Sequence, residues 1–272
     1  FENCVLYPQM SVYENMAFGL RLKRLPEREI DKMVRAMADH LNLADMLDAL
    51  PEQLTEAQRQ LAAVGRALVR KPQVFLMDRP FSSRNAAIKE DMQNELIKLY
   101  QALKITSIYA TGDPMEAMKM GTKVVVMNEG TIQQAGTPRE ICETPANRFV
   151  ARFMGNPGAN ILEARISEEN GQIWVDLKTS RVRLPEKFSE QLRKGDYVGK
   201  EGSLGIRPEH VFLGNRDPKD PSNEVYTISG EDCQLSEDGL LLTMTGEDGI
   251  FAIRLSESVK EQLGDTVSCY MD

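Results

Sequence analysis

The sequence has few of the residues that build metal centres and disulfide frameworks. It has only two histidines, His40 and His210, which lie far apart in the chain. Its four cysteines are scattered and form no CxxC pair. Zinc sites and disulfide frameworks need such residues in close, regular spacing. We therefore expect no histidine- or cysteine-based metal site, and cysteines that stay as reduced thiols.

Acidic residues outnumber basic ones, 41 to 33, and long apolar runs are absent. The net charge is -8 and the sequence pI is about 5.1, which argues against a nucleic-acid partner, because such partners favour basic patches. No apolar run approaches the ~18 residues that a membrane span needs, and no stretch resembles a signal peptide. The chain begins with Phe1 rather than Met, so we expect a fragment whose natural beginning is missing.

The first part of the chain alternates between helical and strand-like patterns. Apolar residues recur at helical spacing or form short runs bounded by turn residues. The predicted helices are 26–50, 58–70, 86–103, a short one near 114–120, one opening at Thr137 and one through Phe149 and Phe153; the predicted strands are 74–77, 106–111 and 123–127. This alternation predicts a parallel sheet wrapped by helices.

The pattern changes at NPGAN (156–160). Beyond it, short strand-like runs dominate, with one possible helix at 185–194. The runs are ILEARI, QIWVDL, RVRL, LLLTMT, GIFAIRL and TVSCYM. This pattern is typical of a small antiparallel barrel or sandwich, with Trp174 in its core. We therefore predict two domains, residues 1–156 and 157–272.

Several motifs occur together in a specific order and spacing. They are FENCVLYPQMSVYENMAFGL (1–20), LTEAQRQ (54–60), VFLMDRP (74–80), YATGD (109–113), the segment 123–155 and GIRPEHV (205–211). The set resembles the ATP-binding subunits of ABC importers, most closely the sugar and glycerol-phosphate group. The resemblance implies an α/β P-loop-type nucleotide-binding domain, N-terminally truncated in this chain, with a helical subdomain at about 11–62. An OB-like regulatory barrel is implied for the second domain.

The resemblance also implies an activity and partners. Subunits of this family bind ATP and Mg²⁺ and hydrolyse ATP at the interface of two such subunits, which drives transport through membrane partners. It implies contact with transmembrane permease subunits through residues 6–20, and with a second ATP-binding subunit, identical or different. The expected location is cytoplasmic, peripheral on the inner face of the cell membrane.

Asp78 ends an apolar strand and is followed by Arg79. By resemblance, Asp78 matches the family's aspartate that holds Mg²⁺ through water. Arg79 stands where the family has the glutamate that polarises the attacking water. An arginine cannot accept a proton at pH 7, and loss of a general base typically costs about 10²- to 10⁴-fold in rate. We therefore expect impaired hydrolysis.

LTEAQ stands where the family has LSGGQ, the segment that approaches the partner subunit's γ-phosphate. Thr55 and Gln58 are the candidate nucleotide-binding residues that remain. Glu56 and Ala57 replace the two glycines that let the backbone approach closely. A carboxylate ~5 Å from a phosphate charge would repel it by roughly 3 kcal/mol at an effective dielectric of ~20. Glu56 also suits an ordinary helix start.

Further departures fall on other positions that meet ATP in the family. Gly112 replaces the histidine that contacts the γ-phosphate, and Arg84 and Asn85 replace the Leu-Asp pair that couples the two sites. Glu2 replaces a glutamine, although its carboxylate can still coordinate a hard cation. The phosphate loop GxxxxGK[ST] does not occur in the sequence, and we expect it upstream of Phe1.

Two interpretations of function stay open, together with a blander one. The first is an importer ATP-binding subunit with degenerate catalytic motifs, which would bind nucleotide weakly or not at all and hydrolyse it poorly. The second is a non-enzymatic scaffold or regulatory subunit that docks on membrane subunits, and the third is a non-functional remnant. Measured ATP turnover discriminates the first two. The transported substrate cannot be inferred, because substrate choice lies in other subunits.

Overall fold

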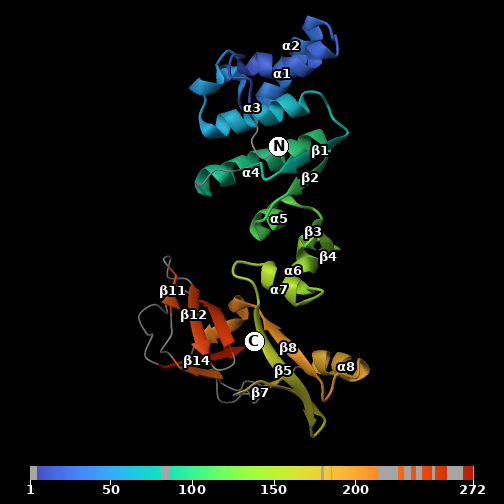
Figure 1. The fold of residues 1–272 in the computed structure, drawn as a ribbon, viewed down its shortest axis with the longest axis vertical. Coiled ribbons are helices and arrows are strands. Elements are labelled where there is room, and N and C mark those ends of the chain that lie inside the picture. The colour runs from blue at the N-terminus through green and yellow to red at the C-terminus, as the bar shows by residue number, and fades with distance from the viewer. Residues whose placement is uncertain are drawn as a thin grey trace. The chain divides into compact units, whose positions relative to one another are not determined.

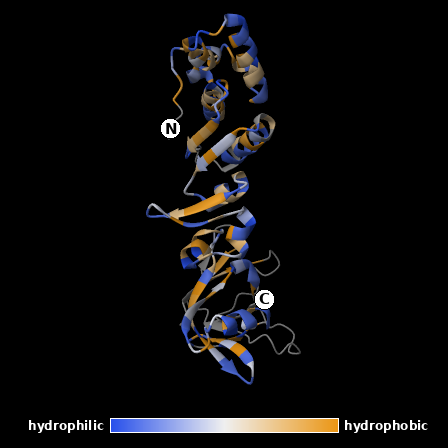
Figure 2. Cartoon of the chain, turned by 90° about the vertical axis from the view of Figure 1, so that its right-hand side faces the viewer, coloured by the Kyte–Doolittle hydropathy of each residue, from blue (hydrophilic) through white to orange (hydrophobic). Residues whose placement is uncertain are grey.

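The computed structural model describes residues 5–80, 86–178, 181–184, 186–213, 226–229, 234–236, 241–246, 249–255 and 266–271. The chain divides into two compact units, residues 1–122 and 123–272 (Figure 1). Helices dominate the first unit and antiparallel strands the second. Helices in both units carry hydrophobic and hydrophilic stretches (Figure 2), as expected where one face is buried. None of the described helices is long and apolar enough to cross a membrane.

Three helices form the helical part of the first unit. They are α1 (Val12–Leu22), α2 (Glu27–His40) and α3 (Glu56–Leu68), with single 3₁₀ turns η1 (Ala44–Met46) and η2 (Pro51–Gln53) between α2 and α3. Their buried faces share one apolar core, which includes Met16, Leu20, Ile30, Val34 and Leu68. Each helix alone would be marginal in water, so this shared core supplies most of its stability.

The predicted helix 26–50 is wrong in its second half. The helix ends at His40, and Asn42 adopts the left-handed conformation with φ of 55°. Asparagine tolerates this conformation, which ends a helix, and η1 and η2 follow in place of regular helix. The predicted helix 58–70 begins earlier than expected, at Glu56, because the Thr55 side chain caps it.

Two parallel strands follow α3. β1 (Val74–Asp78) and β2 (Thr106–Ala110) pair from Val74 opposite Thr106 to Asp78 opposite Ala110. They are the described part of the predicted parallel sheet. Helix α4 (Ala86–Leu103) connects them as predicted, and α5 (Pro114–Met120) follows β2. The hydroxyl of Tyr100 in α4 donates to Met77 Sδ at 2.8 Å, so one face of β1 packs on this helix.

The second unit begins with a hairpin and two short helices. β3 (Val124–Asn128) and β4 (Thr131–Gly136) are antiparallel, and the turn residues Glu129 and Gly130 both have positive φ. α6 (Pro138–Glu143) and α7 (Arg148–Phe153) follow. Thr137, where a helix is predicted to open, is its N-cap: Thr137 Oγ1 accepts a hydrogen bond from the Glu140 N–H, and the Glu140 carboxylate accepts one from the Thr137 N–H.

The remaining strands form small antiparallel sheets. A four-stranded sheet has the order β7-β6-β5-β8, and the other described strands form sheets ordered β10-β14-β9 and β11-β12-β13. Their bounds are β5 Asn160–Glu169, β6 Gln172–Asp176, β7 Arg181–Arg183, β8 Glu201–Ile206, β9 Val211–Leu213, β10 Tyr226–Ser229, β11 Gln234–Leu235, β12 Leu241–Gly246, β13 Gly249–Arg254 and β14 Thr266–Met271; the 3₁₀ turn η3 is Pro208–His210. Their core contains Leu162, Val211, Leu242, Phe251 and Ile253.

Trp174 does not lie in this core. It is half-buried, because the alternation of β6 directs Ile173 and Val175 inward and Trp174 to the opposite face. The guanidinium of Arg181 lies 4.1 Å from the centre of the indole ring and covers it. The indole is therefore shielded by a cation–π contact rather than by apolar packing.

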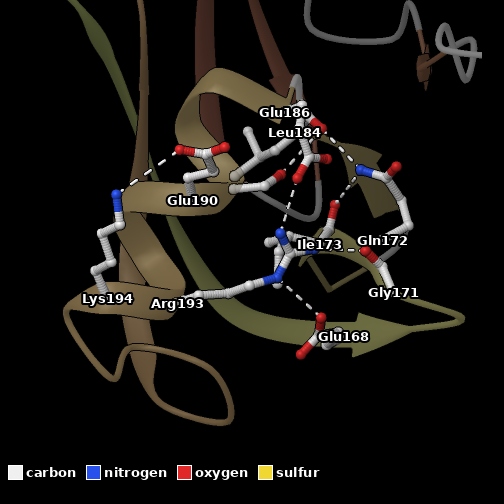
Figure 3. A network of polar contacts seen from close by, with 10 residues as sticks. Glu168, Gly171, Gln172, Ile173, Leu184, Glu186, Glu190, Arg193 and Lys194 are labelled. Atoms are coloured by element: carbon white, nitrogen blue, oxygen red, sulfur yellow. Dashed lines mark hydrogen bonds and ion pairs between the residues drawn. The ribbon is translucent and has the colours of Figure 1, made fainter.

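Helix α8 (Glu186–Lys194), predicted at 185–194, is fastened to the β5–β6 hairpin by Arg193 (Figure 3). The Arg193 guanidinium binds Glu168 at 3.0 Å, binds Glu186 at 2.8 Å and donates to the carbonyl of Gly171. These carboxylates raise the pKa of Arg193, chiefly through the hydrogen bond to Glu186.

Arg207, in GIRPEHV, fixes the start of the barrel. Its guanidinium donates to the carbonyl of Met154 and, at 2.8 Å, to that of Cys142. The Asn160 side chain pairs with both backbone groups of Ala252, at 2.9 and 2.7 Å. These contacts join 142–160 to the strands, and residues 123–153 accordingly group with the barrel. The domain boundary near 157 stays a prediction.

Candidate functional site

The carboxyl ends of β1 and β2 bring three of the predicted site residues together. The Arg79 N–H donates to the Ala110 carbonyl at 2.9 Å, which continues the strand pairing one residue beyond Asp78. Arg79 has a φ of 42°, in the left-handed region that non-glycine residues rarely adopt. Asp78 and Arg79 are both exposed. The strand end therefore presents a carboxylate and a guanidinium side by side to solvent.

Gly112 lies next to the Arg79 side chain. A Cβ built on Gly112 would be 3.8 Å from Arg79 Nη2, and no other described atom outside residues 111–113 lies within 4 Å of that point. The guanidinium thus faces the space that a side chain at position 112 would enter. Positions 79 and 112 are therefore neighbours, with a cation beside a residue that has no side chain.

A polar cluster holds the turn that contains Gly112. The buried carboxylate of Glu116 forms an ion pair with Lys89 of α4 and accepts hydrogen bonds from the Thr111 hydroxyl and, at 3.1 Å, from the Tyr109 hydroxyl. Lys89 Nζ also lies 3.2 Å from Asp113 Oδ2. The turn between β2 and α5 is therefore fixed to the helix that follows residues 81–85.

Asp113 caps α5 and completes this cluster. Its Oδ1 accepts hydrogen bonds from the N–H groups of Met115 at 2.9 Å and Glu116 at 3.3 Å. Burial opposes ionisation of Asp113, but the hydrogen bonds from Lys89 and from these two N–H groups outweigh it and lower its pKa. The hydrogen bond to Glu116 raises the pKa of Lys89, and burial raises that of Tyr109. At neutral pH, Lys89 and Asp113 therefore carry opposite charges.

Thr55 and Gln58 lie at the start of α3, apart from the strand ends in the sequence. Thr55 Oγ1 accepts a hydrogen bond from the Gln58 N–H at 3.2 Å, and Gln58 Oε1 accepts one from the Thr55 N–H at 3.0 Å. This reciprocal pair is a capping box, which satisfies two backbone donors of the first turn. Glu56 is exposed, and Ala57 packs against the core. Their role in binding nucleotide stays a prediction.

The predicted docking segment, residues 6–20, is held by Asn15, which is fully buried. The Asn15 side chain accepts a hydrogen bond from the Tyr7 N–H at 2.8 Å and donates to the carbonyls of Tyr7, Met10 and Ser11 at 3.0–3.1 Å. The ring of Tyr7 lies 5.1 Å from that of Phe18. The loop before α1 is therefore fixed in one conformation by a single amide.

A groove of about 670 Å³ lies beside this segment. Its lining includes Tyr7 and Phe18, the basic residues Arg66 and Arg70, and Leu76 of β1. The guanidinium of Arg66 lies 5.3 Å from the centre of the Tyr7 ring, and Leu76 is 67% exposed. The groove thus combines an apolar floor with cations.

Comparison with known proteins finds matches to two protein families and to individual relatives. The sequence profile of the ABC transporter family matches residues 1–82, and that of the MalK OB fold domain matches residues 155–211. The chain is 38% identical over 269 residues to the uncharacterized ABC transporter ATP-binding protein YurJ of Bacillus subtilis, covering 98% of this chain and 72% of that protein. The chain belongs to the ATP-binding proteins of ABC transporters.

The chain is also similar to members of this ABC family whose names state the substrate that they import. The trehalose/maltose import ATP-binding protein MalK of Thermococcus litoralis is 46% identical over 213 residues, and the oligosaccharides import ATP-binding protein MsmX of Bacillus subtilis is 43% identical over 211 residues. Each match covers 78% of this chain but only 56% and 57% of those relatives. The matches confirm the predicted fold class, an ABC ATP-binding domain followed by an OB-fold domain.

Membership of this family implies binding of ATP together with Mg²⁺. Within the described ranges, no group of three or more His, Cys, Asp or Glu residues is placed to hold a metal ion. The exposed Asp78 carboxylate suits a metal held through water, and the Arg79 guanidinium suits a phosphate oxygen. The predicted sites at Glu2, Arg84 and Asn85 lie outside the described residues.

Proposed function

We propose that this chain belongs to the ATP-binding subunit of a carbohydrate-type ABC importer, and that it binds ATP but hydrolyses it poorly. The observation that carries the proposal is Arg79, at the end of β1 directly after Asp78. ATP hydrolysis needs a group that orients and polarises a water, and a guanidinium has no acceptor for its proton. The substrate class rests on relatives named for trehalose/maltose and oligosaccharide import.

Neighbouring carboxylates do not replace the missing base. Glu116 is buried and is held by Lys89, Tyr109 and Thr111, while Asp113 caps α5. Gly112 has no side chain. Asp78 keeps its exposed carboxylate, which suits the family's role in holding Mg²⁺ through water. Among the described residues around the strand ends, binding groups are therefore present, and none of the neighbouring carboxylates named here is placed as a proton acceptor for the attacking water.

The proposed partners are transmembrane permease subunits and a second ATP-binding subunit. The permease contact is assigned to residues 6–20, and support comes from the Asn15 hydrogen bonds that hold the loop 7–11 rigid. A rigid loop loses little conformational entropy on docking. The Thr55 end of α3 is assigned to the second subunit's nucleotide. The corresponding proposed location is peripheral, on the inner face of the cell membrane.

A scaffold that docks without binding nucleotide is the second candidate. Two observations favour it. The segment 6–20, which would dock on the permease, is held in place by hydrogen bonds, and an exposed carboxylate, Glu56, lies at the start of α3 where nucleotide would bind. A negative charge there repels phosphate, by the Coulomb argument given above. ATP binding distinguishes the two functions, because the scaffold needs none.

The test uses the complete gene product, purified alone and with its permease subunits. We expect ATP turnover far below ~1 s⁻¹ with and without permease, and measurable binding of fluorescent ATP. Turnover above ~1 s⁻¹ would contradict the loss of hydrolysis. Absence of nucleotide binding together with permease binding would favour the scaffold, and absence of both would exclude the two functions.

A further inference from the structure

Arg79 and Gly112 lie side by side, one with a long side chain and the other with none. Loss of the proton acceptor at position 79 would not by itself require this combination. A proton acceptor at position 79 could be lost to any residue, and position 112 could then carry any side chain. Instead, a long cationic side chain at 79 faces a residue with no side chain at 112, with Nη2 3.8 Å from the position of a Cβ. The two positions are complementary in size.

The backbone at Gly112 does not itself require glycine. Its φ is outside the left-handed region, unlike that of Gly130 or Gly155. A Cβ at this position would make only ordinary van der Waals contact with the guanidinium. A larger side chain would extend beyond the Cβ into the volume beside Arg79. The space that remains free at residue 112 therefore matters because of Arg79 and not because of local strain.

Hydrogen bonds hold both the backbone of Arg79 and the turn that contains Gly112. The Arg79 N–H is bonded to the Ala110 carbonyl, two residues before Gly112. The turn after Ala110 is held in turn by the bonds of Thr111 and Asp113 to Glu116 and Lys89. A guanidinium on such a support can meet an anion without a large loss of conformational freedom.

We propose that Arg79, given room by Gly112, recognises the terminal phosphate of a nucleoside triphosphate and makes the subunit prefer ATP to ADP. This inference rests on the proposed function, since it concerns the same strand ends. A guanidinium binds phosphate oxygens with charge-assisted hydrogen bonds, and it stays charged throughout the physiological pH range. Arg79 would therefore hold the bound nucleotide through its terminal phosphate, and neither Arg79 nor Gly112 supplies a proton acceptor for its hydrolysis.

The experiment measures binding rather than turnover. Affinities of the complete gene product for ADP and for a non-hydrolysable ATP analogue are compared by calorimetry in four variants. R79M removes the charge at similar length, R79K keeps a charge without the planar fork, and G112H fills the space beside Arg79. R35M is the matched control, because Arg35 is an exposed arginine of α2 that forms an ion pair with Asp31 of the same helix.

We expect R79M to reduce the preference for the triphosphate by about tenfold or more while ADP affinity stays the same, which is the size of one charge-assisted hydrogen bond. R79K should keep part of the preference, and R35M all of it. G112H should weaken triphosphate binding in the presence of Arg79, whereas G112A should not, because its Cβ makes ordinary contact.

Each outcome decides a separate point. An unchanged preference in R79M overturns the role of Arg79, and an unchanged affinity in G112H overturns the size relation between the two positions. If the wild-type protein binds ADP and the triphosphate equally, the inference fails while the proposed function stands. If it binds neither nucleotide, the proposed nucleotide-binding function fails as well.

Discussion

Lys89 forms an ion pair with the buried carboxylate of Glu116, and this pair connects α4 to α5 across the end of β2. The side chain of Glu116 is only 7% exposed, whereas that of Lys89 is 26% exposed. Removal of one partner from such a pair costs more than removal from a surface pair, because it leaves a desolvated charge without its counter-ion. The pair therefore sets the position of the turn at Gly112.

The substitution K89M tests this relationship. We expect it to destabilise the first unit by about 2 kcal/mol, because Glu116 keeps its hydrogen bonds from Tyr109 and Thr111 but loses its cation. Amide hydrogen exchange in α5 should become faster than in α1. The double variant K89M/E116Q should recover part of the loss, since no buried charge remains. Equal stability of K89M and wild type would show that Glu116 does not need Lys89.

The N-terminal cap of α5 gives a prediction about pH. Asp113 has a lowered pKa in the folded protein, so its charge stabilises the fold above the unfolded value of about 4, and this contribution is lost as pH falls through the folded value. D113N keeps a good capping side chain but has no charge. We expect D113N to be less stable than wild type at pH 7 by about 1 kcal/mol or less, because Asp113 is 42% exposed.

This difference should shrink as pH falls below about 4 toward the lowered pKa of Asp113, where the wild-type carboxyl also becomes protonated. Thermal unfolding of both proteins between pH 7 and pH 3, with exchange of the α5 amides as a local probe, measures it. E90Q is a suitable control, because Glu90 forms an exposed ion pair with Lys119 in the same region. A gap between D113N and wild type that is the same at both ends of the range would exclude the charge of Asp113 as the cause.

The sequence predicted those elements whose signals are local. Thr137 followed by Pro138 and Glu140 predicts a capped helix start, and the helix is there, because the cap depends on residues within one turn. Likewise, the apolar run ending at Asp78 predicts β1. The end of α2 was missed, since apolar residues continue after His40 and the left-handed Asn42 carries only a weak breaker signal.

The contacts between distant segments could not be predicted in the same way. No local pattern pairs Lys89 with Glu116, because Lys89 lies in α4 and Glu116 in α5, and β2 separates these two helices in the sequence. Their proximity follows from the β1–β2 register and the packing of α4. Asp113, before Pro114, was available as a capping signal, and it would have identified the acidic member of this cluster. Arg79 was identified as a site position from the sequence motif around it, but only the structure shows that its side chain lies beside Gly112.

The proposed docking segment gives a prediction about binding. N15A removes an amide that makes four hydrogen bonds to the backbone of the loop before α1, including those to the Tyr7 N–H and the Met10 carbonyl. We expect a loss of about 2–3 kcal/mol in the stability of this loop and a clear fall in affinity for the permease subunits. K32A, on the exposed surface of α2, is the control. Unchanged permease binding by a folded N15A protein would remove residues 6–20 from the interface.

The last prediction concerns hydrolysis itself. If Arg79 and Gly112 together account for the poor turnover that we propose, then the paired change R79E/G112H should raise ATP turnover by about 10²-fold, because it restores a proton acceptor beside Asp78. R79E alone should give a smaller gain, and G112H alone none, since the guanidinium still faces residue 112. R79Q/G112H is the matched control, because glutamine keeps the size of glutamate and accepts no proton. If R79E/G112H and R79Q/G112H turn over ATP at the same rate, the defect lies elsewhere, and Glu56 at the start of α3 becomes the next position to reverse.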